Sequence, residues 1–150
     1  MNLDGYALPI KQLKGTEPVE SLDLSGKNLG VASAIVIASL ISVNGSLTKM
    51  SLALNHLEEE GTKAICGALE QNKTLKELDI SGGYGSNIGG LAGAKHVAKM
   101  LGVNGSLTSL NLGDNQLCGL DRFGRGTYTA DGITAIADAL RVNGSLTEVR

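Results

Sequence analysis

Apolar residues along this chain follow two spacings, one typical of short strands and the other typical of helices. The pattern L-x-x-L-x-L-x-x-N-x-L runs from residue 107 to 117 and, with Met50 in place of the second leucine, from 47 to 57. Its alternating apolar positions predict a strand with one buried face. After residue 57 the spacing changes, and Ala64, Ile65 and Ala68 lie on one stripe of a predicted helix. Each strand is therefore expected to precede a helix.

The chain repeats this strand and helix at a regular step. The phrase NGSLT begins at Asn44, Asn104 and Asn143, and a looser copy begins at Asn72. With Val19 as an earlier anchor, units start near residues 19, 47, 75, 107 and 146, at steps of 28, 28, 32 and 39 residues. Residues 1–18 are interpreted as a partial or atypical repeat. Each asparagine also begins an N-x-S/T sequence, for which we favour a turn over glycosylation.

The repeats covering residues 19–150 resemble the leucine-rich repeat, and the step of 28 residues resembles its ribonuclease-inhibitor-like class. The resemblance implies an α/β solenoid, a right-handed βα superhelix with about five parallel strands and about four helices. Stacked units bury each other's apolar faces in a continuous aliphatic core. Such a core is consistent with a composition of 21 glycines, 3% aromatic residues and no tryptophan.

The ninth position of the pattern holds asparagine in two units, as Asn55 and Asn115. Its amide can satisfy backbone groups where each strand leaves the sheet. The first and third units have lysine and glycine there instead, which puts a continuous ladder in doubt. The neighbouring Asn28 and Asn87 are candidates to substitute after a local shift.

Charge and composition argue against several classes of function. A formal charge of −2 gives no basic surface that would attract nucleic acid or an anionic membrane. The most apolar stretch, residues 31–43, is shorter than the roughly 20 residues needed to cross a bilayer. Residues 1–15 lack the features of a signal peptide, so we expect an intracellular location with no membrane insertion.

The side chains that most often catalyse reactions or bind metals are scattered. His56 and His96 lie in different units with no third ligand at a metal-like spacing. Cys66 and Cys118 each follow a core residue and are interpreted as small apolar fillers. The glycines between residues 82 and 90 do not form a phosphate-binding motif. We therefore expect no enzyme activity, no metal and no cofactor.

Two insertions provide the best candidate for a binding surface. The third and fourth units carry extra residues between strand and helix, in the ranges 82–90 and 118–130. Equivalent insertions in stacked units emerge on one edge, so we expect these loops to lie side by side. They contain aromatic and arginine side chains of the kinds that dominate protein interfaces, namely Tyr84, Arg122, Phe123, Arg125 and Tyr128. The alternative is that Phe123 folds back over the core.

Three other features bear on partners. The outer face of the first repeat helix has lost its charges, with Ile35 and Ala34 assigned to that face, and is expected to be covered by residues 6–10 or by a foreign partner. The outward positions of the sheet are small, polar and mixed in sign, which makes the sheet face a weak candidate. Neither end shows a polar capping unit, so the chain is a segment of a longer repeat protein or is covered in an assembly.

These observations predict a non-enzymatic protein-interaction or scaffold module. The partner is expected to be another protein, within a larger assembly or a longer repeat chain. Two alternatives stay open: a permanent structural subunit of a large complex, and a regulator of a small GTPase of the GTPase-activating type. The sequence names no partner.

Overall fold

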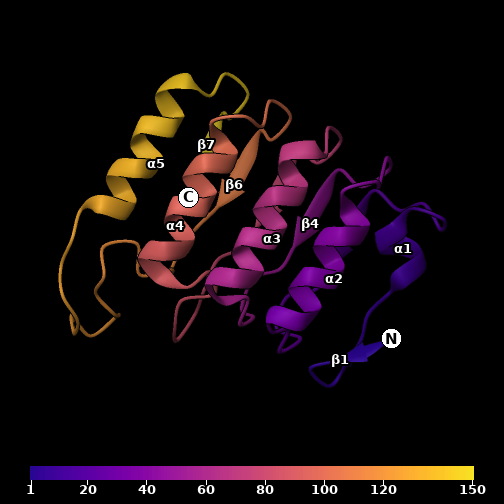
Figure 1. The fold of residues 1–150 in the computed structure, drawn as a ribbon, viewed down its shortest axis with the longest axis horizontal. Coiled ribbons are helices and arrows are strands. Elements are labelled where there is room, and N and C mark those ends of the chain that lie inside the picture. The colour runs from indigo at the N-terminus through magenta and orange to yellow at the C-terminus, as the bar shows by residue number, and fades with distance from the viewer.

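The computed structural model of the chain describes residues 1–150 and has two layers. A row of helices covers one face of a five-stranded parallel sheet (Figure 1). The strands of this sheet are β3 Ser21–Asp23, β4 Lys49–Ser51, β5 Glu77–Asp79, β6 Ser109–Asn111 and β7 Glu148–Val149. The helices between them are α2 Val31–Ile41, α3 Glu58–Gln71, α4 Gly90–Leu101 and α5 Asp131–Val142. No helix is long and apolar enough to span a membrane.

The strands follow one another in sequence order, as the solenoid prediction requires. Their register aligns Ser21, Lys49, Glu77, Ser109 and Glu148 in one row across the sheet. The row reproduces the steps of 28, 28, 32 and 39 residues between the anchors in the sequence. The predicted parallel solenoid is therefore confirmed, and the extra residues in the last two steps leave the sheet in register.

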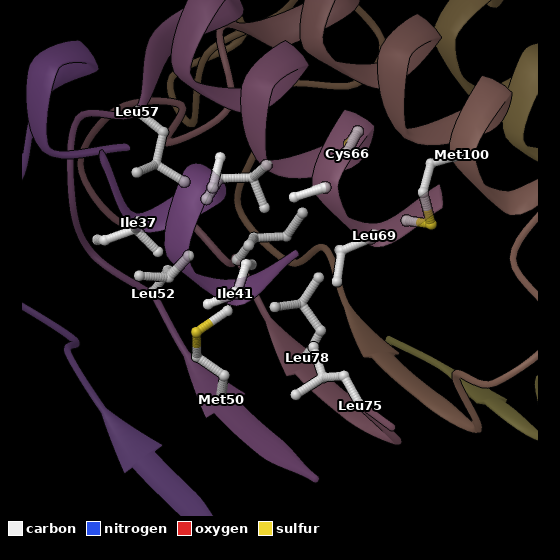
Figure 2. Close-up of a cluster of buried hydrophobic side chains, with 14 of the residues drawn as sticks. Ile37, Ile41, Met50, Leu52, Leu57, Cys66, Leu69, Leu75, Leu78 and Met100 are labelled. Atoms are coloured by element: carbon white, nitrogen blue, oxygen red, sulfur yellow. The ribbon is translucent and has the colours of Figure 1, made fainter. Parts of the chain in front are cut away.

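The core lies between the sheet and the helices and is aliphatic (Figure 2). The central residues of four strands, Leu22, Met50, Leu78 and Leu110, are at most 9% exposed. They belong to the same buried cluster as Ile37 of α2, and no aromatic side chain is among the buried members of that cluster. Close packing between repeated leucine, isoleucine and alanine positions thus replaces the large rings of an ordinary core.

The helices α2 and α3 approach each other closely where Gly61 meets Ala34. A Cβ atom at position 61 would lie 2.8 Å from the Ala34 Cβ, nearer than real side chains pack, so this contact requires glycine. Ala34 is completely buried, and its assignment to the outer face of the helix was wrong. The assignment failed because the aligned residue of α3, Thr62, is itself buried.

The first fifteen residues form structure that the repeat pattern does not predict. Strands β1 Asn2–Leu3 and β2 Tyr6–Ala7 pair antiparallel. A short helix, α1 Ile10–Lys14, follows them and adds to the four helices of the repeats. Leu8 and Leu13 of this segment are buried in the main core. The N-terminal segment, expected from the sequence to lack a capping unit, packs on the first repeat and adds these two leucines to the core.

Asp4, in the β1–β2 turn, anchors this segment to the start of α2. Its carboxylate accepts hydrogen bonds from the Gly30 amide at 2.9 Å and from the Ser33 hydroxyl at 2.6 Å. The hydrogen bond from Ser33, followed by that from Gly30, holds the pKa of Asp4 below its ordinary value of 3.8. A carboxylate at a helix N-terminus also interacts favourably with the helix dipole.

The asparagine ladder continues through the third unit. Asn87 is fully buried, donates to the Leu52 carbonyl at 2.8 Å and accepts from the Leu57 amide at 3.2 Å. Asn55 and Asn115 make equivalent bonds with the units that precede them. Of the two candidate substitutes, Asn87 therefore joins the ladder, whereas Asn28 is exposed and stands outside it.

A second row of asparagines comes from the repeated phrase itself, at positions 44, 72, 104 and 143. Each side-chain oxygen accepts the amide of the leucine three residues later, as Asn44 does from Leu47 at 2.9 Å. Each Nδ2 donates to the preceding unit, as Asn44 does to Gln12 and Leu13. The atom that a glycan would modify is thus engaged in the fold, which supports the turn interpretation.

Candidate protein-binding edge

Two long loops leave the sheet at one edge, after neighbouring strands. Residues 80–89 connect β5 to α4, and residues 112–130 connect β6 to α5. Because β5 and β6 are parallel, both loops emerge at C-terminal strand ends, on the side below α4 and α5 in Figure 1. The Gly82 amide donates to the Gly113 carbonyl at 2.8 Å and joins the two loops directly. Their predicted adjacency is confirmed.

Asp121 organises the longer loop. Its Oδ1 accepts the amides of Phe123 and Arg125, both at 2.9 Å, and its Oδ2 accepts the Arg125 Nε at 2.8 Å. The backbone hydrogen bond from Arg125 is the main cause that lowers the pKa of Asp121. The carboxylate thereby fixes a tight turn that places the side chains of residues 122, 123 and 125 on the surface.

Cation–π contacts link the two loops through their side chains. The guanidinium carbon of Arg122 lies 4.8 Å from the Tyr84 ring centre and 5.3 Å from the Phe123 ring centre. The guanidinium of Arg125 lies 5.0 Å from the Phe123 ring centre. These distances are within the range of attractive cation–π interaction. We call Tyr84, Arg122, Phe123 and Arg125 the loop-edge cluster.

The cluster is open to solvent. Tyr84 is 90% exposed and Phe123 is 69% exposed, so the alternative that Phe123 covers the core is wrong. Phe123 stays outside because the Asp121 turn and the two guanidinium groups hold it there. Tyr128 is 66% exposed on the same loop but makes no cation–π contact with the cluster. The structure thus brings together four of the five loop residues that the sequence singled out.

Two open hollows border the cluster. One has a volume of about 430 Å³ and is lined by Leu54, Gly83, Tyr84, Asp114 and Arg122. The other, of about 340 Å³, shares Tyr84 and Arg122 and extends past Leu120 and Ile133 toward α5. Leu54 was missed by the sequence reasoning. The sequence did mark Leu54 as unusual, since the positions equivalent to it in the first and fourth units hold glycine and aspartate.

Ile35, the remaining predicted binding residue, lies elsewhere. It is 51% exposed on α2, two repeats away from the inserted loops. Residues 6–10 leave it uncovered, since half of its surface stays exposed although α1 packs along α2. Ile35 therefore forms no part of the loop edge.

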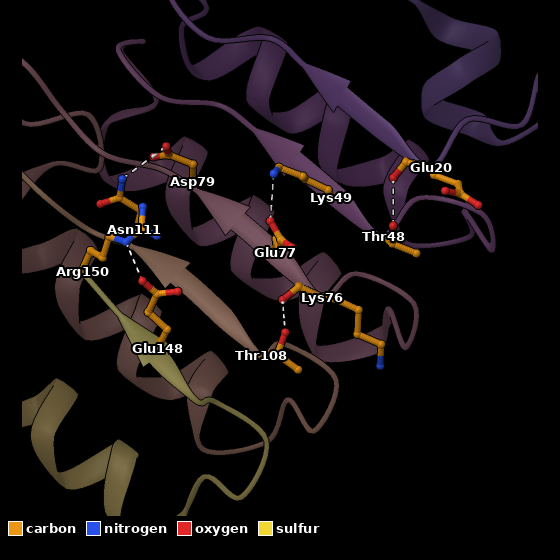
Figure 3. A network of polar contacts seen from close by, with 10 residues as sticks. All are labelled: Glu20, Thr48, Lys49, Lys76, Glu77, Asp79, Thr108, Asn111, Glu148 and Arg150. Atoms are coloured by element: carbon orange, nitrogen blue, oxygen red, sulfur yellow. Dashed lines mark hydrogen bonds and ion pairs between the residues drawn. The ribbon is translucent and has the colours of Figure 1, made fainter.

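The outer face of the sheet is polar and largely paired within the protein (Figure 3). Lys49 forms an ion pair with Glu77 at 3.0 Å, and Asn111 donates to Asp79 at 3.3 Å. Arg150 extends the face beyond the positions read from the sequence, but it pairs with Glu148 at 2.7 Å. No aromatic side chain lies on this face, which supports the interpretation of the sheet face as the weaker candidate.

The remaining reactive side chains do not assemble into a site. Cys66 is buried, and desolvation raises the pKa of its thiol to about 12, which keeps it protonated and a poor nucleophile. His96 lies 3.4 Å from Glu59 on the helical surface. No group of three or more His, Cys, Asp and Glu side chains is placed to hold a metal ion.

Comparison with known proteins agrees with this architecture. A family model described as Leucine Rich repeat matches residues 103–117. The chain is 28% identical over 113 residues to RAN GTPase-activating protein 2 of Arabidopsis thaliana, covering 71% of this chain and 21% of that protein. It is 33% identical over 97 residues to the NACHT, LRR and PYD domains-containing protein 14 of Mus musculus, covering 64% of this chain and 9% of that protein.

Solved structures share the whole fold. Leiomodin-1 Actin-Binding Site 2 superposes with a TM-score of 0.76 at 19% identity, covering 94% of this chain and 75% of that chain. The tropomodulin C-terminal domain of Caenorhabditis elegans gives a TM-score of 0.73 at 15% identity, covering 93% of this chain and 78% of that chain. Identities this low show the fold alone.

Strand-and-helix units stacked in one parallel sheet define an α/β solenoid of the kind that presents extended surfaces to other proteins. The chain is built of stacked units with the leucine-rich-repeat fold, and the family model matches one of these repeats directly. It spans about a fifth or less of the length of the two curated relatives described above.

Proposed function

We propose that this chain is a non-enzymatic module that binds another protein through the loop-edge cluster. The observation that carries the proposal is Arg122, which lies against Tyr84 of one loop and Phe123 of the other while both rings remain largely exposed. Tyrosine and arginine are among the residues that contribute most to protein interfaces. A self-contained fold would gain more from burying these rings than from holding them in solvent.

The way the cluster is built favours binding with little rearrangement. The Asp121 turn and the cation–π contacts fix the side chains in advance, so less conformational entropy is lost when a partner docks. Arg125 is already paired with Asp121, whereas the Arg122 side chain takes part in none of the ion pairs. Its N–H donors are therefore free for a partner's acceptors.

A photo-crosslinking amino acid, p-benzoylphenylalanine, tests this proposal in cells that naturally express the chain. It would replace Tyr84 at the cluster, Ile35 on α2 or the exposed Lys63 on α3, one position at a time. We expect adducts with a defined protein from position 84 and none from position 63. Adducts from position 35 alone would contradict the proposal and move the binding surface to α2.

One relative favours a second function, regulation of a small GTPase, because RAN GTPase-activating protein 2 is similar over 71% of this chain. An exposed arginine such as Arg122 could also stabilise the charge that develops during phosphoryl transfer. GTP hydrolysis by purified Ran, with the parent chain or with Arg122→Ala, separates the two functions. A pure binding module leaves the hydrolysis rate unchanged, whereas stimulation that Arg122→Ala abolishes would favour the regulator.

A further inference from the structure

Leu54 has a backbone conformation that leucine rarely adopts. Its φ is 56°, in the left-handed region, three residues after the paired strand residue Ser51. The equivalent positions in the first and fourth units are Gly26, with φ 63°, and Asp114, with φ 54°. Glycine has no Cβ, and aspartate can offset the cost with local side-chain hydrogen bonds, whereas leucine bears the clash between its Cβ and the following carbonyl oxygen without compensation. Leucine is thus the costly choice at a position where the chain elsewhere uses tolerant residues.

Backbone and side-chain bonds to neighbouring units hold the turn at Leu54. The Leu54 amide donates to the Ser81 carbonyl at 2.9 Å, as the Gly26 amide does to the Ala53 carbonyl at 2.9 Å. The next residue, Asn55, is locked into the asparagine ladder. Because backbone bonds and the ladder fix the turn, nothing in the turn itself calls for a leucine side chain.

Burial does not explain the leucine either. Leu54 is 56% exposed and is not a member of the buried core. Its side chain leans toward Gly83 of the next unit, where an added Cβ would lie 2.7 Å from the Leu54 Cδ2. From there it lines the hollow of about 430 Å³ that Tyr84, Asp114 and Arg122 also line. An apolar, strained and exposed residue beside the loop-edge cluster points to contact with something outside the chain.

We infer that Leu54 extends the binding edge and that its hollow receives a large apolar side chain of a protein partner, next to an acidic residue of that partner. This inference rests on the proposed function. Leu54 and Tyr84 supply apolar walls, and the unpaired Arg122 offers forked N–H donors that match a carboxylate. Asp114 lines the same hollow but forms no ion pair with Arg122, so the guanidinium stays available to a partner's carboxylate while the apolar side chain supplies most of the affinity.

A library of random 12-residue peptides displayed on phage tests the partner's chemistry with the purified chain as bait. We expect enriched sequences to share a large apolar residue followed or preceded by Asp or Glu. One enriched peptide would then be synthesised with a fluorescent label, and its Kd measured by fluorescence anisotropy. A selection that enriches no such sequence overturns the inference.

Three variants locate the contact. Leu54→Asn suits the left-handed turn but removes the apolar side chain, and we expect it to raise the Kd at least tenfold while the thermal midpoint stays at or above that of the parent. Leu54→Met keeps an apolar side chain and should bind within about threefold of the parent. Val43→Asn, a matched loss of an exposed apolar residue on another surface, should leave the Kd unchanged.

The outcomes separate this inference from the proposed function. Peptide binding that Arg122→Ala weakens and Leu54→Asn leaves intact would overturn the role of Leu54 but keep the cluster as the binding site. Binding that neither change affects would overturn both. Leu54→Asn that melts earlier and binds as tightly as the parent would show that Leu54 is structural. Each Kd is measured at a temperature at which circular dichroism shows the variant to be folded. Weak binding by Leu54→Asn together with near-parent binding by Leu54→Met therefore reports on the side-chain contact and not on unfolding.

Discussion

Replacing Asn87 with alanine should destabilise the fold strongly, because the side chain connects two repeats inside the protein. It accepts from the Leu57 amide and donates to the carbonyls of Leu52, Ile80 and Ser81. The three carbonyls keep a second donor each, but the Leu57 amide has no other acceptor. An orphaned buried amide costs about 1–3 kcal/mol, and the weaker bonds and the void add about 1 kcal/mol. We expect a loss of about 2–4 kcal/mol.

Urea denaturation followed by circular dichroism measures this loss, and amide hydrogen exchange locates it. At about 2–4 °C per kcal/mol for a chain of this size, the thermal midpoint should fall by roughly 10 °C. The Leu57 amide should lose more protection than amides of α5. Asn28→Gly is the control, because Asn28 is exposed with φ 58° and should cost less than about 0.5 kcal/mol. If both variants unfold at the same urea concentration, the reasoning about the ladder is refuted.

Other changes test other parts of the structure. Leu110→Ala should cost about 2–5 kcal/mol in urea denaturation, because Leu110 is fully buried at the centre of β6, and unchanged stability would contradict the register. Asp4→Ala should cost about 1–2 kcal/mol at neutral pH by removing the acceptor for Ser33. Because folding lowers the pKa of Asp4, the contribution of its ionised form is complete above pH 3.8 and is lost as the pH falls through the folded-state pKa, so the gap between the two urea midpoints should narrow in acid. Ile35→Lys should change the stability by less than about 0.5 kcal/mol and weaken any assembly through α2 seen in sedimentation, whereas an unfolded variant would place Ile35 in the core.

The solenoid could be predicted from sequence because every unit repeats the same spacing of apolar residues. Residues such as Met50, Leu78 and Leu110 recur at one phase of the pattern, and a parallel sheet with a constant register is the arrangement that buries them all. Residues 1–15 carry no copy of the pattern. Their hairpin and helix depend on tertiary contacts made by Leu8 and Leu13, which no local periodicity reveals.

The proposed binding edge was partly predictable for a similar reason. Equivalent insertions must emerge together, so the adjacency of Tyr84 and Arg122 follows from the repeat alone. The outward position of Phe123 does not follow, because it depends on the Asp121 turn. Leu54 was harder to recognise in a leucine-rich sequence. The glycine and aspartate at the equivalent positions were a sequence signal, and its backbone conformation and exposure complete the case.

The most direct test of the central claim is partner capture by a chain shortened across the longer loop. Deleting residues 119–129 brings Leu117 and Gly132 to the four-residue spacing of Leu57 and Gly61, and none of the deleted residues is buried. The shortened chain should therefore fold, as circular dichroism can confirm. With the protein identified by crosslinking from position 84, surface plasmon resonance should show the Kd rising at least tenfold. Folded, shortened protein that binds this partner as tightly as the parent does would contradict the account.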